Sequence, residues 1–367
     1  MSDTPLTLRA LNRATLARQM LLEREKTSVL DAVEQLLALQ AQQAKPPFIG
    51  LWSRVAGFGR DSLNVLLHRK EVVRATLMRG TLHLASAKDY RHLRASFTPL
   101  LEASVASVLR ERAKGLDVAP LVKDARAFFD EAPRTFEALR DHLVARYPRN
   151  DERAMGFAVR MFLPLIQVPT ETAWGYPGTT DFAVAESWLG ASLRAEADLP
   201  TLVRRYLAAF GPATVADAQT WSGLNGLKAT FESLRPSLRT FRGEKGRELF
   251  DVPEAQRPDE DTPAPPRFLP EFDSLVLGHE DRARLVDEAY RPRLITKNLR
   301  VPATFLVDGF IAGTWTVERK RSVAALVVEP FAPIKKKKKD RDALVKEGEA
   351  LLRFLEPDAR TFEVRGH

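Results

Sequence analysis

The sequence contains no cysteine among its 367 residues. This absence excludes disulfide bonds, thiolate metal sites and cysteine nucleophiles. Histidine is also scarce, and none of the six histidines has a second histidine four positions away, the spacing of a common zinc-binding helix. We therefore expect neither a metal ion nor another cofactor.

Long apolar runs are missing as well. No uncharged stretch approaches the roughly 20 apolar residues that a membrane-spanning helix needs. The first residues do not combine a charged segment with an apolar one, so we expect no signal peptide. These absences predict a cytoplasmic protein without a membrane partner.

Positive charge exceeds negative charge. Lys and Arg number 56 against 48 Asp and Glu, which gives a net charge of +8. A basic balance favours a polyanionic partner, most often nucleic acid. A charge excess that serves only solubility is the alternative.

One order of elements occurs three times along the chain. In each copy, helices are followed by two short strands with a turn between them, an arrangement typical of winged-helix DNA-binding units. The first copy has helices from Leu8, Ser28, Pro46 and Asp61, then strands around Arg79-Gly80. The helix from Leu8 is expected to reach Leu22, and Ser28 and Asp61 are expected to cap theirs.

The second and third copies follow a connecting helix at 86–115, in which Pro99 is the expected point of any interruption. The second copy has helices at 121–129, 135–145 and 152–162 and strands at 165–168 and 182–184. The third has helices at 202–210, 214–223 and 228–234 and strands at 238–241 and 248–251. In the third copy, Thr214 and Asp217 are spaced as a capping box.

The composition changes after the third copy. Prolines and acids concentrate between Pro253 and Pro270, which predicts an extended linker or an edge loop. Beyond it, strands at 301–307 and 310–317 flank Asp308-Gly309, a strong hairpin signal. A strand at 323–328, a helix at 341–355 and a strand at 361–364 complete a β-rich part.

These patterns predict an α+β fold with three tandem winged-helix units and a β-rich C-terminal domain. The expected boundaries are 1–85 for the first unit, 86–115 for the connecting helix, 116–190 and 191–252 for the other units, 253–270 for the linker and 271–367 for the C-terminal domain. Three different units in one chain favour a monomer on double-stranded DNA. A regulator or a protein-binding scaffold is the alternative.

Gln40 and Gln42 are the candidate catalytic residues. If the helix through Val33 and Leu37 continues, Gln40 lies on its buried face, where an amide needs hydrogen-bond partners. Residues two apart on a helix point about 200° apart, so both amides share a pocket only if the last turn unwinds. The alternative is that Gln40 satisfies a backbone carbonyl and Gln42 faces solvent.

Several basic residues are candidate DNA contacts. Arg74 and Arg79 lie on the first hairpin, and Arg319, Lys320 and Arg321 form a basic cluster near the C-terminus. Such side chains bind phosphate or simply cover a solvated edge. The five lysines from Lys335 to Lys339 are typical of a solvated, non-specific anion patch. Asp273, His279 and Asp281 fit no metal-ligand spacing, so we expect structural roles for them.

Five segments resemble winged helix-turn-helix DNA glycosylases of the AlkZ and YcaQ type. They are ALNRATLARQ at 10–19, LQAQ at 39–42, GLWSR at 50–54, MRGTLHL at 78–84 and VDGFIAGTW at 307–315. The resemblance implies three winged-helix units around a DNA channel and a catalytic Gln-aliphatic-Gln motif, matched here by Gln40 and Gln42 as in the AlkZ-like members.

The resemblance also implies an activity. It is the monofunctional release of N7-alkylated purines from DNA, in some members including interstrand crosslinks, in general repair or in self-resistance of antibiotic producers. A glutamine is no general base, but it can orient water and turn its carbonyl dipole toward charge on the sugar. That suffices when the base is already cationic. A DNA-binding protein without catalysis, either a regulator or a lesion-shielding protein, is the alternative. Either protein would be nucleoid-associated while bound.

Overall fold

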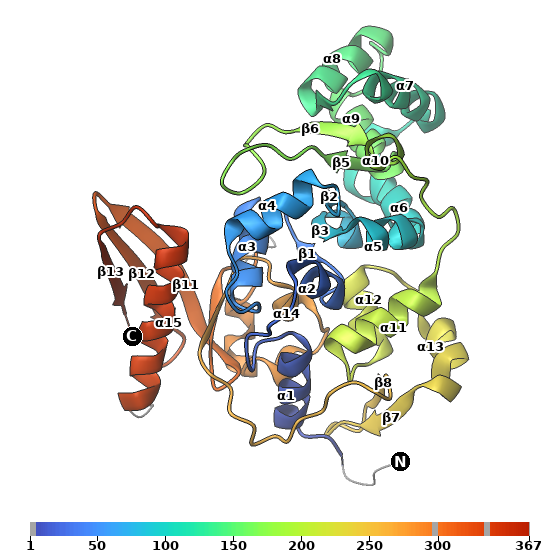
Figure 1. Cartoon of the computed structure of the whole chain (residues 1–367). Coiled ribbons are helices and arrows are strands. Elements are labelled where there is room, and N and C mark those ends of the chain that lie inside the picture. Colours follow the sequence, from blue (N-terminus) through green and yellow to red (C-terminus); the bar gives the residue numbers. More distant parts are fainter. Residues whose placement is uncertain (1–4, 296–299, 334–337, 367) are drawn as a thin grey trace.

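The computed structural model describes residues 5–295, 300–333 and 338–366 and shows a mixed α+β fold (Figure 1). The N-terminal part begins with one helix, which is followed by a second helix, a short strand, two helices and a β-hairpin. These elements are α1 (Leu8–Arg18), α2 (Val29–Gln35), β1 (Leu39–Gln40), α3 (Lys45–Trp52), α4 (Arg60–His68), β2 (Val72–Thr76) and β3 (Leu82–Ser86).

Local signals set most of these boundaries. The Ser28 hydroxyl accepts a hydrogen bond from the Asp31 amide at 3.0 Å, which caps α2 as predicted. Three predictions are wrong. Helix α1 ends at Arg18 instead of Leu22, and α4 is preceded by Gly59 instead of being capped by Asp61. The predicted helical course through Leu37 also fails, because α2 ends at Gln35 and Leu37 has φ of 66°.

The order helix, short strand, two helices and hairpin recurs in the second part of the chain. Its elements are α7 (Val118–Glu131), β4 (Arg134–Thr135), α8 (Phe136–Arg146), α9 (Glu152–Phe162), β5 (Leu165–Gln167) and β6 (Asp181–Val184). In both copies the short strand pairs with the last strand, β1 with β3 and β4 with β6. The sequence predicted the hairpins but not β1 and β4.

A third copy has α11 (Leu199–Phe210), α12 (Val215–Ser222), α13 (Lys228–Leu234), β7 (Arg239–Arg242) and β8 (Glu248–Asp251). A single bridge between Ala213 and Phe250 takes the place of the short strand. The capping box predicted from Thr214 and Asp217 is present. In all three copies the last strand of the hairpin therefore pairs with the segment that precedes the second helix of the copy.

The first two copies share one sheet of six strands, in the order β1-β3-β2-β5-β6-β4. Strands β2 and β5 join its halves, with Arg74 opposite Gln167 and Ala75 opposite Ile166. Because these hydrogen bonds link the two copies, residues around β1 are held on a continuous sheet.

The predicted connecting helix at 86–115 is interrupted. It consists of α5 (Ala87–Leu93), a 3-10 turn at Arg94–Phe97, α6 (Thr98–Leu109) and a second 3-10 turn at Arg110–Ala113. Pro99 stands in the first turn of α6, where its missing N–H costs nothing. The proline therefore starts a new helix. A short helix, α10 (Ala185–Leu189), leads from β6 toward the third copy.

A five-stranded sheet in the order β13-β12-β11-β10-β9 forms the C-terminal part. Asp308 and Gly309, with φ of 52° and 80°, make the predicted two-residue turn. The prediction of a linker over 253–270 is wrong at its C-terminal end, because strand β9 (Arg267–Leu269) lies there. The elements are β9 (Arg267–Leu269), α14 (Ser274–Leu277), β10 (Thr304–Val307), β11 (Phe310–Lys320), β12 (Val323–Pro330), α15 (Lys338–Leu355) and β13 (Thr361–Arg365).

Figure 1 shows how these parts are arranged. Helices α7 and α8 form the upper end, the β7–β8 hairpin lies at the lower end, and α15 with its sheet stands along one side. In the described part of the chain, no helix is both long enough and apolar enough to cross a membrane. Of the five-lysine run, Lys335 to Lys337 lie outside the described residues, and Lys338 and Lys339 are exposed at the start of α15.

Helix α1 ties the parts together through buried polar side chains. The Arg18 guanidinium binds both carboxylate oxygens of Asp251 in β8, at 2.7 and 2.8 Å. The Arg13 guanidinium binds the Asp308 carboxylate at 2.7 Å in the β10–β11 turn. Buried charges need such partners, so α1 fixes the third copy relative to the C-terminal sheet.

Candidate active site

Gln40 is the last residue of β1 and is only 7% exposed. Its Oε1 accepts a hydrogen bond from Nη2 of Arg79 at 2.7 Å. A guanidinium has donors only, so the amide atom that faces it must be the oxygen. The Gln40 amide nitrogen makes no hydrogen bond to the described residues and is not fully buried, so it stays accessible.

Gln42 lies just beyond the strand and is exposed. The pairing with β3 continues through Ala41, whose N–H donates to the Leu82 carbonyl at 2.7 Å. The helix that would point Gln40 and Gln42 about 200° apart has already ended at Gln35. The unwinding that a shared site requires is therefore present. The Gln42 Oε1 is 3.4 Å from the Leu82 N–H, a long contact.

The Arg79 side chain is enclosed by acceptors from three elements. Its guanidinium donates to Gln40, to the Trp221 carbonyl of α12 and to Nε2 of His83, the last at 3.3 Å. Its backbone φ is 54°, in the left-handed region. Burial lowers the Arg79 pKa to about 10. No ion pair involves Arg79 in the described part of the chain.

His83 is 1% exposed and lies opposite Gln40 on β3. Its Nδ1 is 2.9 Å from the Thr81 carbonyl, so Nδ1 carries the proton and Nε2 is the acceptor for Arg79. Burial, and then the positive charge of Arg79, lower the His83 pKa to about 3. His83 is therefore neutral at ordinary pH, and its one ring proton is directed at the Thr81 carbonyl.

The His83 environment gives a prediction for stability against pH. The unfolded chain takes up the His83 proton below its ordinary pKa of 6.5, whereas the folded chain does so only near 3. Stability is therefore lost as pH falls through this window, by up to about 1.4 kcal/mol per pH unit. The free energy of unfolding, measured in urea, should fall less steeply between pH 6 and 4 in His83→Gln than in the wild type. The difference in slope corresponds to about one proton taken up on unfolding. Equal slopes in both proteins would contradict the assignment.

Arg74 supports the backbone of the candidate motif. It is 5% exposed, and its guanidinium donates to the Ala41 carbonyl at 2.8 Å and to the Gln42 carbonyl at 3.2 Å. It also lies 4.9 Å from the ring centroid of Tyr176, in the β5–β6 loop. Arg74 is buried within the sheet, whereas Arg79 is partly exposed in the turn of the hairpin. Their phosphate contacts remain a prediction.

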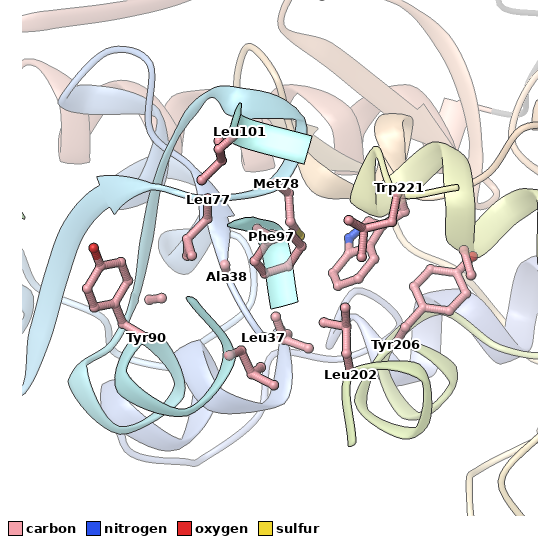
Figure 2. Packing of buried hydrophobic residues seen from close by; sticks show 14 of the residues in the cluster. Leu37, Ala38, Leu77, Met78, Tyr90, Phe97, Leu101, Leu202, Tyr206 and Trp221 are labelled. Atoms are coloured by element: carbon pink, nitrogen blue, oxygen red, sulfur yellow. The ribbon is translucent and has the colours of Figure 1, made fainter. Parts of the chain in front are cut away.

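A hydrophobic cluster supports the elements that carry the site. Leu37 and Ala38 precede β1, Leu77 and Met78 precede Arg79, and Trp221 belongs to α12; all five are buried in one cluster. Figure 2 shows Met78 and Phe97 between Leu77 and the Trp221 ring. Because side chains in a protein core are closely packed, this cluster holds the backbone at Gln40, Arg79 and Trp221 in a fixed arrangement.

The segment at 270–274 borders Gln40 from the C-terminal part. Gln40, Glu271 and Ser274 line one small pocket, and the Ser274 hydroxyl donates to the Ala38 carbonyl at 3.3 Å. Asp273 has a structural role, because its carboxylate binds the Arg54 guanidinium at 2.8 and 2.9 Å. Sequence reasoning missed Glu271, an exposed carboxylate that accepts from Gln43 at 3.3 Å.

The remaining candidates lie elsewhere. Arg319, Lys320 and Arg321 are exposed at the tip of the β11–β12 hairpin, where Arg321 has φ of 51°. Within the described residues, no hydrogen bond or ion pair joins them to Gln40 or Gln42. The same part of the chain has no group of three or more His, Asp or Glu that could hold a metal ion.

Comparisons with known proteins agree on one family. A relative from Streptomyces sahachiroi named Interstrand DNA cross-link repair glycosylase is 27% identical over 346 residues, which cover 86% of this chain and 88% of the relative. The solved structure of Streptomyces sahachiroi DNA glycosylase AlkZ is similar in fold, with a TM-score of 0.77 and 22% identity over 99% of this chain and 100% of that one. The family model described as DNA glycosylase AlkZ-like matches residues 33–354. Because this match spans most of the sequence, the chain belongs to the AlkZ-like DNA glycosylase family.

Proposed function

We propose that this DNA glycosylase hydrolyses the N-glycosidic bond of N7-alkylated purines in duplex DNA and also unhooks interstrand crosslinks. The crosslink substrate is suggested by the name of the Streptomyces sahachiroi relative. We further propose that the three copies of helices and hairpin are winged-helix units at 1–85, 116–190 and 191–252, and that a monomer wraps on DNA with the C-terminal domain. General repair and self-resistance are both compatible with this activity.

The proposed reaction breaks the bond between C1′ of the sugar and N9 of the purine. Alkylation at N7 makes the base cationic, so it leaves as a neutral molecule without being protonated. Water then bonds to C1′ and loses a proton to solvent, which leaves an abasic site. The enzyme has to hold that water and stabilise positive charge on the sugar, which amide dipoles can do.

The observation that carries the proposal is the state of Gln40. In this chain the Gln40 amide lies at the end of a short strand. Arg79 fixes its oxygen, and its nitrogen is accessible. The nitrogen is not fully buried and has no partner among the described residues. Here one end is satisfied by the protein and the other is available to a substrate or a water molecule.

The experiment that tests the function incubates the protein with a duplex that contains one N7-methylguanine, and separately with a duplex carrying an N7-linked crosslink. We expect release of the free base and strand cleavage only after alkali, because hydrolysis without a lyase step leaves an intact abasic strand. Tight binding without release from either duplex would favour a DNA-binding protein without catalysis.

The hairpin tip gives a prediction for DNA affinity. Replacing Arg319, Lys320 and Arg321 by glutamine is expected to weaken duplex binding and to reduce the slope of log K against log salt by about 0.9 for each phosphate that is no longer neutralised. Titrations at several salt concentrations measure this slope. An Arg319→Lys, Arg321→Lys variant keeps the charge and should keep the slope. An unchanged slope in the glutamine variant would remove the tip from the DNA interface.

A further inference from the structure

We propose that Arg79 is a positioning residue that fixes the Gln40 amide with its NH₂ group toward the substrate and leaves the carbonyl role to Gln42. This inference rests on the proposed glycosylase function and assigns different roles to the two glutamines. It starts from the 2.7 Å hydrogen bond between Nη2 of Arg79 and Oε1 of Gln40.

The position of Arg79 suits it to this role. Three acceptors from β1, β3 and α12 hold its guanidinium, and the residues next to it, Met78 and Gly80, form a tight turn. The turn places Arg79 in a left-handed conformation with φ of 54°, so the side chain leaves the hairpin toward Gln40 and α12. A side chain oriented only toward phosphate would not need acceptors on three elements.

The role of each glutamine follows from hydrogen-bond chemistry. An amide whose oxygen is occupied by a donor can only donate from its free end. Gln40 can therefore bind the oxygen of a water molecule or an acceptor atom of the purine. We assign the carbonyl that faces the positive sugar to Gln42, whose Oε1, within the described residues, is not held by a charged donor and has only the 3.4 Å contact with the Leu82 N–H.

Placing the Arg79 charge behind Gln40 also has an electrostatic reason. A guanidinium that faced the sugar would oppose the positive charge that develops there. Because Arg79 instead donates to three protein acceptors, its charge is used to orient Gln40. The neutral Nε2 of His83 completes this set of acceptors without adding a second charge.

The test is a double-mutant cycle on single-turnover base release from the N7-methylguanine duplex. The four proteins are the wild type, Arg79→Met, Gln40→Ala and the double variant. Arg79→Met is expected to slow release about 100-fold, because small displacements of a positioned group have effects of this size. In the Gln40→Ala background the same change should add almost nothing, since residues that act through one hydrogen bond are not additive.

Two results of the cycle would overturn the proposal. Additive losses would show that Arg79 does not act through Gln40. A weaker affinity with a salt slope lowered by about 0.9, and an unchanged rate at saturating DNA, would make Arg79 a phosphate contact instead. The positioning role replaces the predicted phosphate contact of Arg79, so we expect the DNA affinity and salt slope of Arg79→Met to match those of the wild type.

A second measurement does not depend on activity. Gln40→Glu places a carboxylate against the Arg79 guanidinium and is expected to keep or raise the urea midpoint. In the Arg79→Met background it should lower the midpoint, because the carboxylate is then buried without a partner. An equal shift in both backgrounds would overturn the contact. If the wild type releases no base from either duplex, the proposed function and this role both fail. A shift of the urea midpoint that differs between the two backgrounds would then show only that Arg79 and Gln40 are in contact.

Discussion

The Gln40→Ala, Gln42→Ala double variant is expected to release purine about 100- to 1000-fold more slowly than the wild type, which is the loss seen when a preorganised polar group is removed from a transition state. In the proposed function both side chains act on the water and the sugar, and neither is a phosphate-binding cation. Duplex affinity should therefore stay within a few-fold of the wild type. Single-turnover release from N7-methylguanine DNA and a parallel binding titration measure the two quantities.

Gln43→Ala is the matched control for this variant. Gln43 is an exposed amide in the same segment, and its side chain donates to Glu271 at 3.3 Å instead of contributing to the motif. We expect its rate to stay close to that of the wild type. If the double variant keeps its rate, the catalytic assignment is wrong. If Gln43→Ala loses as much as the double variant, the loss reflects a disturbed segment.

The sequence predicted the elements whose signals are local. The capping box of Thr214 and Asp217 is complete within four residues, and the Asp308-Gly309 hairpin depends on two residues with positive φ. Strands β1 and β4 were missed because each has two residues, too few for alternation to show. Each exists because of pairing with a strand more than forty positions further along the chain.

Only part of the candidate site is visible in the sequence, for the same reason. A glutamine pair near the end of an apolar run is visible in the sequence, and so is an arginine in a turn. The direction of the Arg79 side chain is not, because it depends on a left-handed turn and on the Trp221 carbonyl, 142 positions away. A backbone carbonyl has no sequence signature. The division of roles between Gln40 and Gln42 could therefore come only from three-dimensional contacts.

Asp273→Ala is expected to lower the free energy of unfolding by about 3 to 5 kcal/mol, the range for removing one partner of a buried ion pair. The side chains of Arg54 and Asp273 are 1% and 2% exposed, so the change leaves a guanidinium without its carboxylate inside the protein. It also removes the hydrogen bond from the Leu275 N–H that caps α14, at 2.9 Å. Urea denaturation at pH 7 measures the loss.

The control for the ion pair is Asp287→Ala. Asp287 accepts from the Ala289 N–H at 2.9 Å, the same capping geometry, but it is exposed and forms no ion pair with the described residues. Loss of a cap alone costs about 1 kcal/mol. If Asp273→Ala loses no more than Asp287→Ala, the Arg54 pair contributes nothing. A double variant with Arg54→Met and Asp273→Leu should be more stable than Asp273→Ala, because no buried charge then lacks a partner.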